Sequence, residues 1–160
     1  MLARYKIYRG PRDPADPLPE GSRQDTRWRR TKHPLHPAEA MVKEFLAAPS
    51  GATWRAFRKT YWDELERRHS QDRAPFDRLA ELAGGTDVFI GCSCPTNANP
   101  RVDHCHTFVA LEFMKSKYPD LPIETWDCAV LKIEDGEIAE GHFYYDTGSI
   151  GKQREAQGVS

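Results

Sequence analysis

A short apolar run, Val88-Phe89-Ile90, constrains the fold more than any other segment of this chain. Its length and its β-branched and aromatic residues are typical of a strand buried on both faces of a sheet. The segment before it instead repeats apolar residues at helical spacing: Trp54, Phe57, Tyr61 and Leu65. A buried strand between helical segments predicts an α/β fold, in which helices flank a mostly parallel sheet in three layers.

The rest of the chain fits this order. We expect a strand over residues 5–9, helices over 37–49, 51–67, 74–83 and 104–117, and a C-terminal hairpin of strands over 128–133 and 138–146. Ser50 and Asp103 precede two of these helices and can cap them with side-chain oxygens. The proline-rich residues 10–37 predict a long connecting loop, and such loops are often functional.

Length and charge limit the class of protein. The chain has 160 residues, which suits a single domain over 1–160, with an extension over about 120–150 and a frayed tail over 151–160. The formal net charge of −1 excludes a protein that attracts nucleic acid over its whole surface. No segment approaches the roughly 20 apolar residues of a membrane helix, so we expect a cytoplasmic protein with reduced thiols.

Cysteines and histidines gather on both sides of one predicted loop. Cys92 and Cys94 end the apolar strand, whereas His104, Cys105 and His106 begin the helix that follows. Ligands of α/β proteins bind beyond the carboxyl ends of the strands. The sequence therefore predicts that the two halves of this cluster face one another and form the working site.

Three interpretations of the cluster remain open. Cys92, Cys94 and Cys105, with either His104 or His106, could bind zinc, and three thiolates with an open position would also suit an iron–sulfur cluster or a catalytic metal. Alternatively, Cys94 or Cys105 is a reactive thiolate with His106 as the proton-transfer group, because a helix N-terminus and an imidazolium both lower a thiol pKa. In the third interpretation the cysteines are small apolar core residues.

The proline-rich loop carries arginines around a tryptophan. Three of these arginines could bind phosphate oxygens: Arg23, Arg27 and Arg30. Trp28 could stack on a base. This pattern favours an anionic small molecule or a nucleic-acid component as the ligand. Asp25 beside them could be a general base. Equally, the arginines could pair with Asp25 while Trp28 anchors the loop in the core.

Several motifs resemble a known family in their order and spacing. They are Gly21-Ser22-Arg23, the segment from Asp25 to Arg30, Phe57-x-x-x-Tyr61-x-x-Glu64-Leu65, Cys94, and Cys105-His106-Thr107. Over residues 5–118 or so the chain resembles the domain-of-unknown-function 488 family of small bacterial and archaeal α/β proteins. Thr107 stands where some branches have arginine, and Arg29 where the family has proline. The resemblance implies an α/β fold and an important arginine loop, and it brings no established activity.

Two hypotheses about function follow. In the first, the protein is an enzyme that holds an anionic ligand with Arg23 and Arg27 and acts on it through Cys94 or Cys105. In the second, it is a non-catalytic binding or interaction module whose cysteines are structural. The sequence makes no prediction about the oligomeric state.

Overall fold

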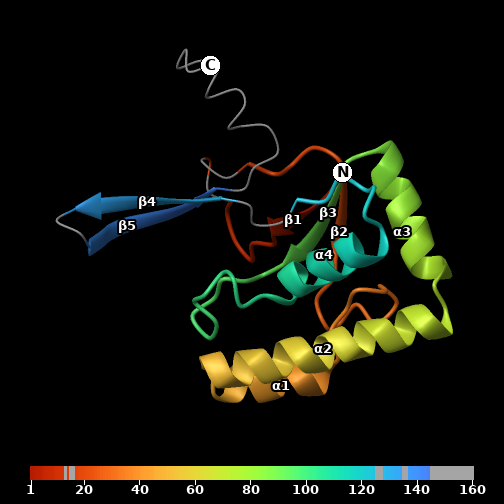
Figure 1. Ribbon diagram of the computed structural model, residues 1–160, viewed down its shortest axis with the longest axis horizontal. Helices are drawn as coiled ribbons and strands as arrows, with labels where there is room; N and C mark the ends of the chain where they lie inside the picture. The colour runs from red at the N-terminus through yellow and green to blue at the C-terminus, as the bar shows by residue number, and fades with distance from the viewer. Residues whose placement is uncertain (13, 15–16, 125–127, 135–136, 145–160) are drawn as a thin grey trace, which may run out of the picture. The chain divides into compact units, whose positions relative to one another are not determined.

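The structure is a computed structural model that describes residues 1–12, 14, 17–124, 128–134 and 137–144, the last two ranges as backbone. Its residues form two compact units that divide after Ile123. The first unit contains a three-stranded parallel sheet and four helices (Figure 1), which confirms the predicted α/β fold. The expectation of a single domain over 1–160 stays a prediction.

The parallel sheet has the strand order β1-β3-β2. The strands are β1 (Leu2–Lys6), β2 (Ser22–Asp25) and β3 (Val88–Cys92). The apolar run forms the central strand β3, with Val88 and Ile90 fully buried. Because Lys6 pairs with Cys92 and Asp25 with Gly91, the carboxyl ends of all three strands meet at one edge. This edge carries the cysteines, as expected for the ligand side of a parallel sheet.

Two expectations about these strands were wrong. The first strand occupies residues 2–6 and not 5–9, because Leu2–Lys6 pair with β3, and Leu2 and Ala3 in it are buried. Strand β2 lies inside the segment 10–37 that was expected to be a loop. It has no apolar residue, and pairing with β3 rather than side-chain burial makes it a strand.

The four predicted helices are present. They are α1 (Glu39–Ala47), α2 (Gly51–Gln71), α3 (Ala74–Gly85) and α4 (His106–Lys117). Ser50 caps α2 as predicted, since its Oγ accepts from the backbone N–H of Thr53 at 3.1 Å. Asp103 does not cap α4. Its carboxylate accepts from Arg101 at 2.6 Å, and Cys105 takes the N-cap position.

Helix α4 is the centre of the core. It packs against β1, β3 and α2, and α2 packs in turn against α1. The predicted inward residues Phe108, Val109 and Phe113 are buried, but so are Leu111 and Met114. The first half of α4 is therefore buried on more than one side, which places its start and its cysteine against the sheet.

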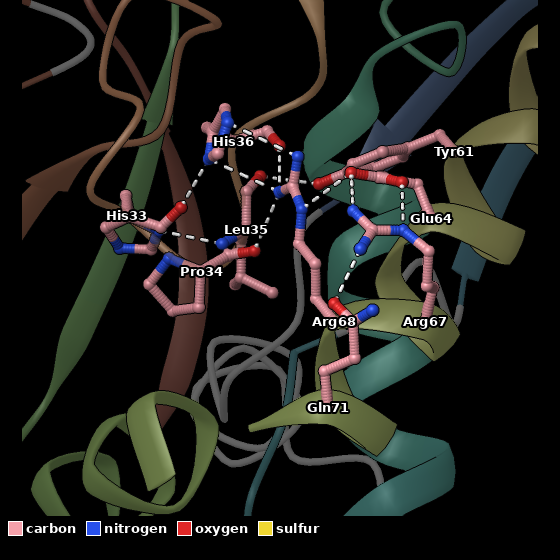
Figure 2. A network of polar contacts seen from close by, with 9 residues as sticks. All are labelled: His33, Pro34, Leu35, His36, Tyr61, Glu64, Arg67, Arg68 and Gln71. Carbon is pink, nitrogen blue, oxygen red and sulfur yellow. Dashed lines mark hydrogen bonds and ion pairs between the residues drawn. The ribbon is translucent and has the colours of Figure 1, made fainter. Parts of the chain in front are cut away.

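The loop that follows β2 is tied to α2 by a polar network (Figure 2). The Tyr61 hydroxyl donates to the carbonyl oxygen of Leu35 at 2.5 Å. The Arg68 guanidinium donates to the carbonyl oxygens of Pro34 at 3.1 Å and His36 at 2.6 Å. These contacts use side chains from α2 to satisfy loop carbonyls, so this part of the proline-rich segment has one defined path.

The second unit contains a hairpin. Strand β4 (Cys128–Glu134) pairs antiparallel with β5 (Glu137–Tyr144) in a two-stranded sheet. The predicted hairpin is therefore confirmed, while residues 145–146 and the expected frayed tail lie outside the described residues. No helix in the described ranges combines the length and the apolar character needed to cross a membrane.

Candidate functional site

Three cysteines converge where β3 ends and α4 begins. The Sγ atoms of Cys92, Cys94 and Cys105 all lie within 4.8 Å of one another, and those of Cys92 and Cys94 are 3.7 Å apart. All three are free cysteines. The two halves of the sequence cluster do face one another across the βα loop, and together these sulfurs are close enough to hold one metal ion.

Hydrogen bonds within the cluster favour the thiolate form of Cys105. Burial raises the pKa of this thiol, but hydrogen bonds from the thiols of Cys92 and Cys94 outweigh burial and hold its pKa well below the ordinary value. The Thr107 hydroxyl also donates to the Cys105 sulfur at 3.1 Å. As the N-cap residue of α4, Cys105 lies at the positive end of a helix dipole. The same hydrogen bonds to Cys105 raise the pKa of Cys92 and Cys94, so the cluster favours a thiolate at Cys105 and thiols at the other two positions.

His106 is buried beside this thiolate. Its Nδ1 lies 4.0 Å from the Cys105 sulfur, and its Nε2 lies 2.9 Å from the hydroxyl oxygen of Thr26. Thr26 is fully buried at the end of β2, and its hydroxyl donates to the carbonyl oxygen of Gly91 at 3.0 Å. Thr26 was missed in the sequence, because nothing in a single threonine shows that it lies next to a histidine 80 positions away.

The His104 ring packs against an aromatic side chain of α2. It stacks on the indole of Trp54, with the ring centroids 4.8 Å apart and an interplanar angle of 15°. Among the described residues, the group able to hold a metal consists of the three cysteines. The prediction that His104 supplies a fourth ligand therefore gains no support from this geometry.

Asp25 and the arginines of the loop bind one another. Arg27 donates to both carboxylate oxygens of Asp25, at 2.9 Å and 2.7 Å, and Arg30 donates to one of them at 2.9 Å. Burial raises the pKa of the Asp25 carboxyl, but these hydrogen bonds outweigh it and hold the pKa well below its usual range. Asp25 is therefore suited to hold Arg27 rather than to act as a base. Arg27 also donates to the Ser93 hydroxyl at 3.2 Å, which places it beside the cysteines.

A cavity of about 610 Å³ opens next to the cysteine cluster. All three cysteines and His106 line it. Its aromatic side chains are Tyr8, Trp28, Phe45, Trp54 and Phe57, and its cationic side chains are Lys6, Arg9 and Arg27. None of the described residues along this cavity is aspartate or glutamate. The local surface is therefore positive, although the chain as a whole carries a formal net charge of −1.

The cations of this cavity differ from those expected. Arg27 and Trp28 line it as expected, whereas Arg23 and Arg30 are exposed and do not. Lys6 and Arg9 were missed because the first strand was expected to end at residue 9. A strand that ends at Lys6 would have pointed to both, since residues just beyond a parallel strand lie on the ligand side of the sheet.

Comparison with family models decides the relationship of this chain. A model described as the active DUF488-N3 subclade matches residues 12–118. The chain belongs to this family. The resemblance noted in the sequence is thereby confirmed, and the DUF488-N3 match runs from the start of the arginine loop to the end of α4, so it includes the cysteine cluster. Comparison with curated proteins and with solved structures found no match.

Proposed function

We propose that the cavity of this DUF488-N3 protein binds an anionic ligand with a planar ring, such as a nucleotide, and presents it to a cysteine thiolate. The observation that carries the proposal is the cavity lining. Cationic and aromatic side chains surround three convergent thiols, and the described lining residues include no carboxylate to repel an anion. Aromatic faces accept a planar ring, and guanidinium groups match phosphate oxygens.

Two neighbouring side chains hold Arg27 in this site. Asp25 and Ser93 fix its guanidinium group in one orientation, so binding an anion there would cost little side-chain entropy. Lys6 and Arg9 add charge on the β1 side of the cavity. Trp54 also lines the cavity, and its ring is stacked with those of His104 and Phe57 at an interplanar angle of 15° in each pair.

Cys94 is the accessible sulfur of the cluster. Its side chain is half-buried, whereas Cys92 and Cys105 are 6% and 1% exposed. In this proposal the Cys105 thiolate accepts the proton of the Cys94 thiol, and Cys94 becomes the thiolate that faces the ligand. His106 is close enough to Cys105 to take the proton onward.

Ligand titration tests the binding proposal. Adenosine monophosphate should quench the fluorescence of the cavity tryptophans, and Arg9→Gln should weaken its binding about tenfold, as expected for the loss of one charge-assisted contact. Arg78→Gln on the exposed side of α3 removes the same charge away from the cavity and is the matched control. Wild-type protein that binds neither adenosine monophosphate nor inorganic phosphate would refute the proposal.

Cysteine substitution separates the two hypotheses about function. If Cys94 works on the ligand, Cys94→Ser should leave the melting temperature nearly unchanged and abolish alkylation at the cavity. If the cysteines are only structural, Cys94→Ser should instead lower the melting temperature while the affinity for adenosine monophosphate stays the same.

The second candidate function is a metal site, favoured by the spacing of the sulfurs. Zinc–sulfur bonds of about 2.3 Å in tetrahedral geometry put two sulfurs about 3.8 Å apart. The Cys92–Cys94 separation of 3.7 Å fits this value. In a four-iron cluster each cysteine binds a different iron atom, so sulfurs this close favour zinc over that cluster. Metal analysis should then find one zinc per chain and none in Cys92→Ser, and wild-type protein free of zinc would refute this candidate.

A further inference from the structure

One buried hydroxyl has no part in the cavity and still contacts the histidine of the site. Thr26 is 0% exposed and is not among the residues that line the cavity. It follows directly on β2, and its oxygen lies between the carbonyl oxygen of Gly91, at 3.0 Å, and Nε2 of His106, at 2.9 Å. A buried hydroxyl in such a position has defined donor and acceptor roles.

The carbonyl oxygen of Gly91 decides those roles. A carbonyl can only accept, so the single hydroxyl hydrogen of Thr26 points to Gly91. The same carbonyl also accepts the backbone N–H of Thr26 at 3.1 Å, and its two lone pairs allow both bonds. The hydroxyl oxygen of Thr26 is therefore left as the acceptor in its contact with His106. His106 can donate to it only if Nε2 carries a hydrogen.

A neutral imidazole carries one hydrogen, so protonation at Nε2 leaves Nδ1 bare. Nδ1 is the atom that lies 4.0 Å from the sulfur of Cys105. The ring is buried to 7% exposure, and Tyr61 packs against it in an edge-to-face contact with the ring centroids 6.0 Å apart. These contacts hold the ring plane while the Thr26 hydroxyl selects which nitrogen faces the thiol.

We infer that Thr26 is a positioning residue, which holds His106 as the Nε2–H tautomer so that a bare Nδ1 faces Cys105. The inference rests on the proposed function in one respect: once the Cys105 thiolate has accepted the proton of Cys94, a bare Nδ1 can take that proton onward. Nε2 keeps its hydrogen bond to Thr26 throughout.

Nuclear magnetic resonance of the full chain tests this inference directly. In protein labelled with ¹⁵N-histidine, long-range ¹H–¹⁵N spectra at one neutral pH should show His106 protonated at Nε2 and bare at Nδ1. Thr26→Val keeps the shape of the side chain and removes the acceptor, so the single-tautomer pattern should be lost. Thr26→Ser keeps the hydroxyl and should restore it, which a purely space-filling role would not predict. The His106→Asn variant assigns the His106 signals, because its spectrum lacks them.

Thr31→Val removes an exposed hydroxyl from the same loop and should leave the His106 signals unchanged. A wild-type His106 protonated at Nδ1, or an unchanged pattern in Thr26→Val, would overturn the inference. If Thr26→Val does not fold, the wild-type and Thr26→Ser spectra still decide it. Titration with adenosine monophosphate separates this result from the proposed function, because Thr26 does not line the cavity and Thr26→Ser should keep the wild-type affinity. Absence of binding in every variant would count against the cavity proposal alone.

Discussion

Replacement of Asp25 by asparagine should destabilise the folded protein at the edge of the sheet where the carboxyl ends of the strands meet. The Asp25 side chain is 17% exposed and accepts hydrogen bonds from Arg27 and Arg30 on the same carboxylate oxygen. In asparagine an amide NH₂ group, which cannot accept, would replace one of the two carboxylate oxygens. If it replaces the oxygen that Arg27 and Arg30 share, two guanidinium contacts lose their acceptor. The Arg27 contact to Ser93 would then loosen as well.

The expected loss follows from this geometry. Hydrogen bonds to charged groups contribute about 1.5–3 kcal/mol each when buried, and the partial exposure of both arginines reduces this, so we expect Asp25→Asn to cost about 2 kcal/mol in total. Urea unfolding followed by tryptophan fluorescence measures the difference. Asp103→Asn is the matched control, because Asp103 also pairs with an arginine but is 52% exposed and should lose less.

The lowered pKa of Asp25 also predicts how the stability difference between wild type and Asp25→Asn changes with pH. The pKa of Asp25 is lowered in the folded protein, so its contribution is complete above the unfolded pKa and is lost as the pH falls through the folded value. Between about pH 7 and about pH 3 the difference between wild type and Asp25→Asn should shrink by about 1 kcal/mol. A loss no larger than that of Asp103→Asn, or a difference that grows in acid, would refute this reasoning.

Three further changes test other parts of the fold. Tyr61→Phe leaves the buried carbonyl of Leu35 without its donor and should cost about 1–2 kcal/mol, measured by urea unfolding, with Tyr8→Phe on the cavity wall as a comparison. Gly21→Ala should cost about 1–3 kcal/mol in the same assay, since Gly21 has φ of 131° and a new Cβ would lie 2.5 Å from a backbone oxygen. If the cysteines hold zinc, chelation should lower the melting temperature of wild type and leave that of Cys92→Ser unchanged.

The sequence by itself determined the elements that have strong local patterns. The β-branched run became β3, and the four-residue apolar spacing of Phe57, Tyr61 and Leu65 became the buried face of α2. It also located the cysteines on both sides of one βα turn. These features were visible because neighbouring residues decide them: burial of one face needs a fixed period, whatever the element later packs against.

Tertiary structure decided everything that depends on pairing between distant segments. Strand β2 is polar and exists because β3 offers its edge, and that pairing brings Thr26 to His106. The register of β1 placed Lys6 and Arg9 at the cavity, whereas Arg23, on β2, lies outside it. A hydrogen bond or a cavity between residues 80 positions apart leaves no periodic trace along the chain, because it depends on distance in space rather than on spacing in sequence.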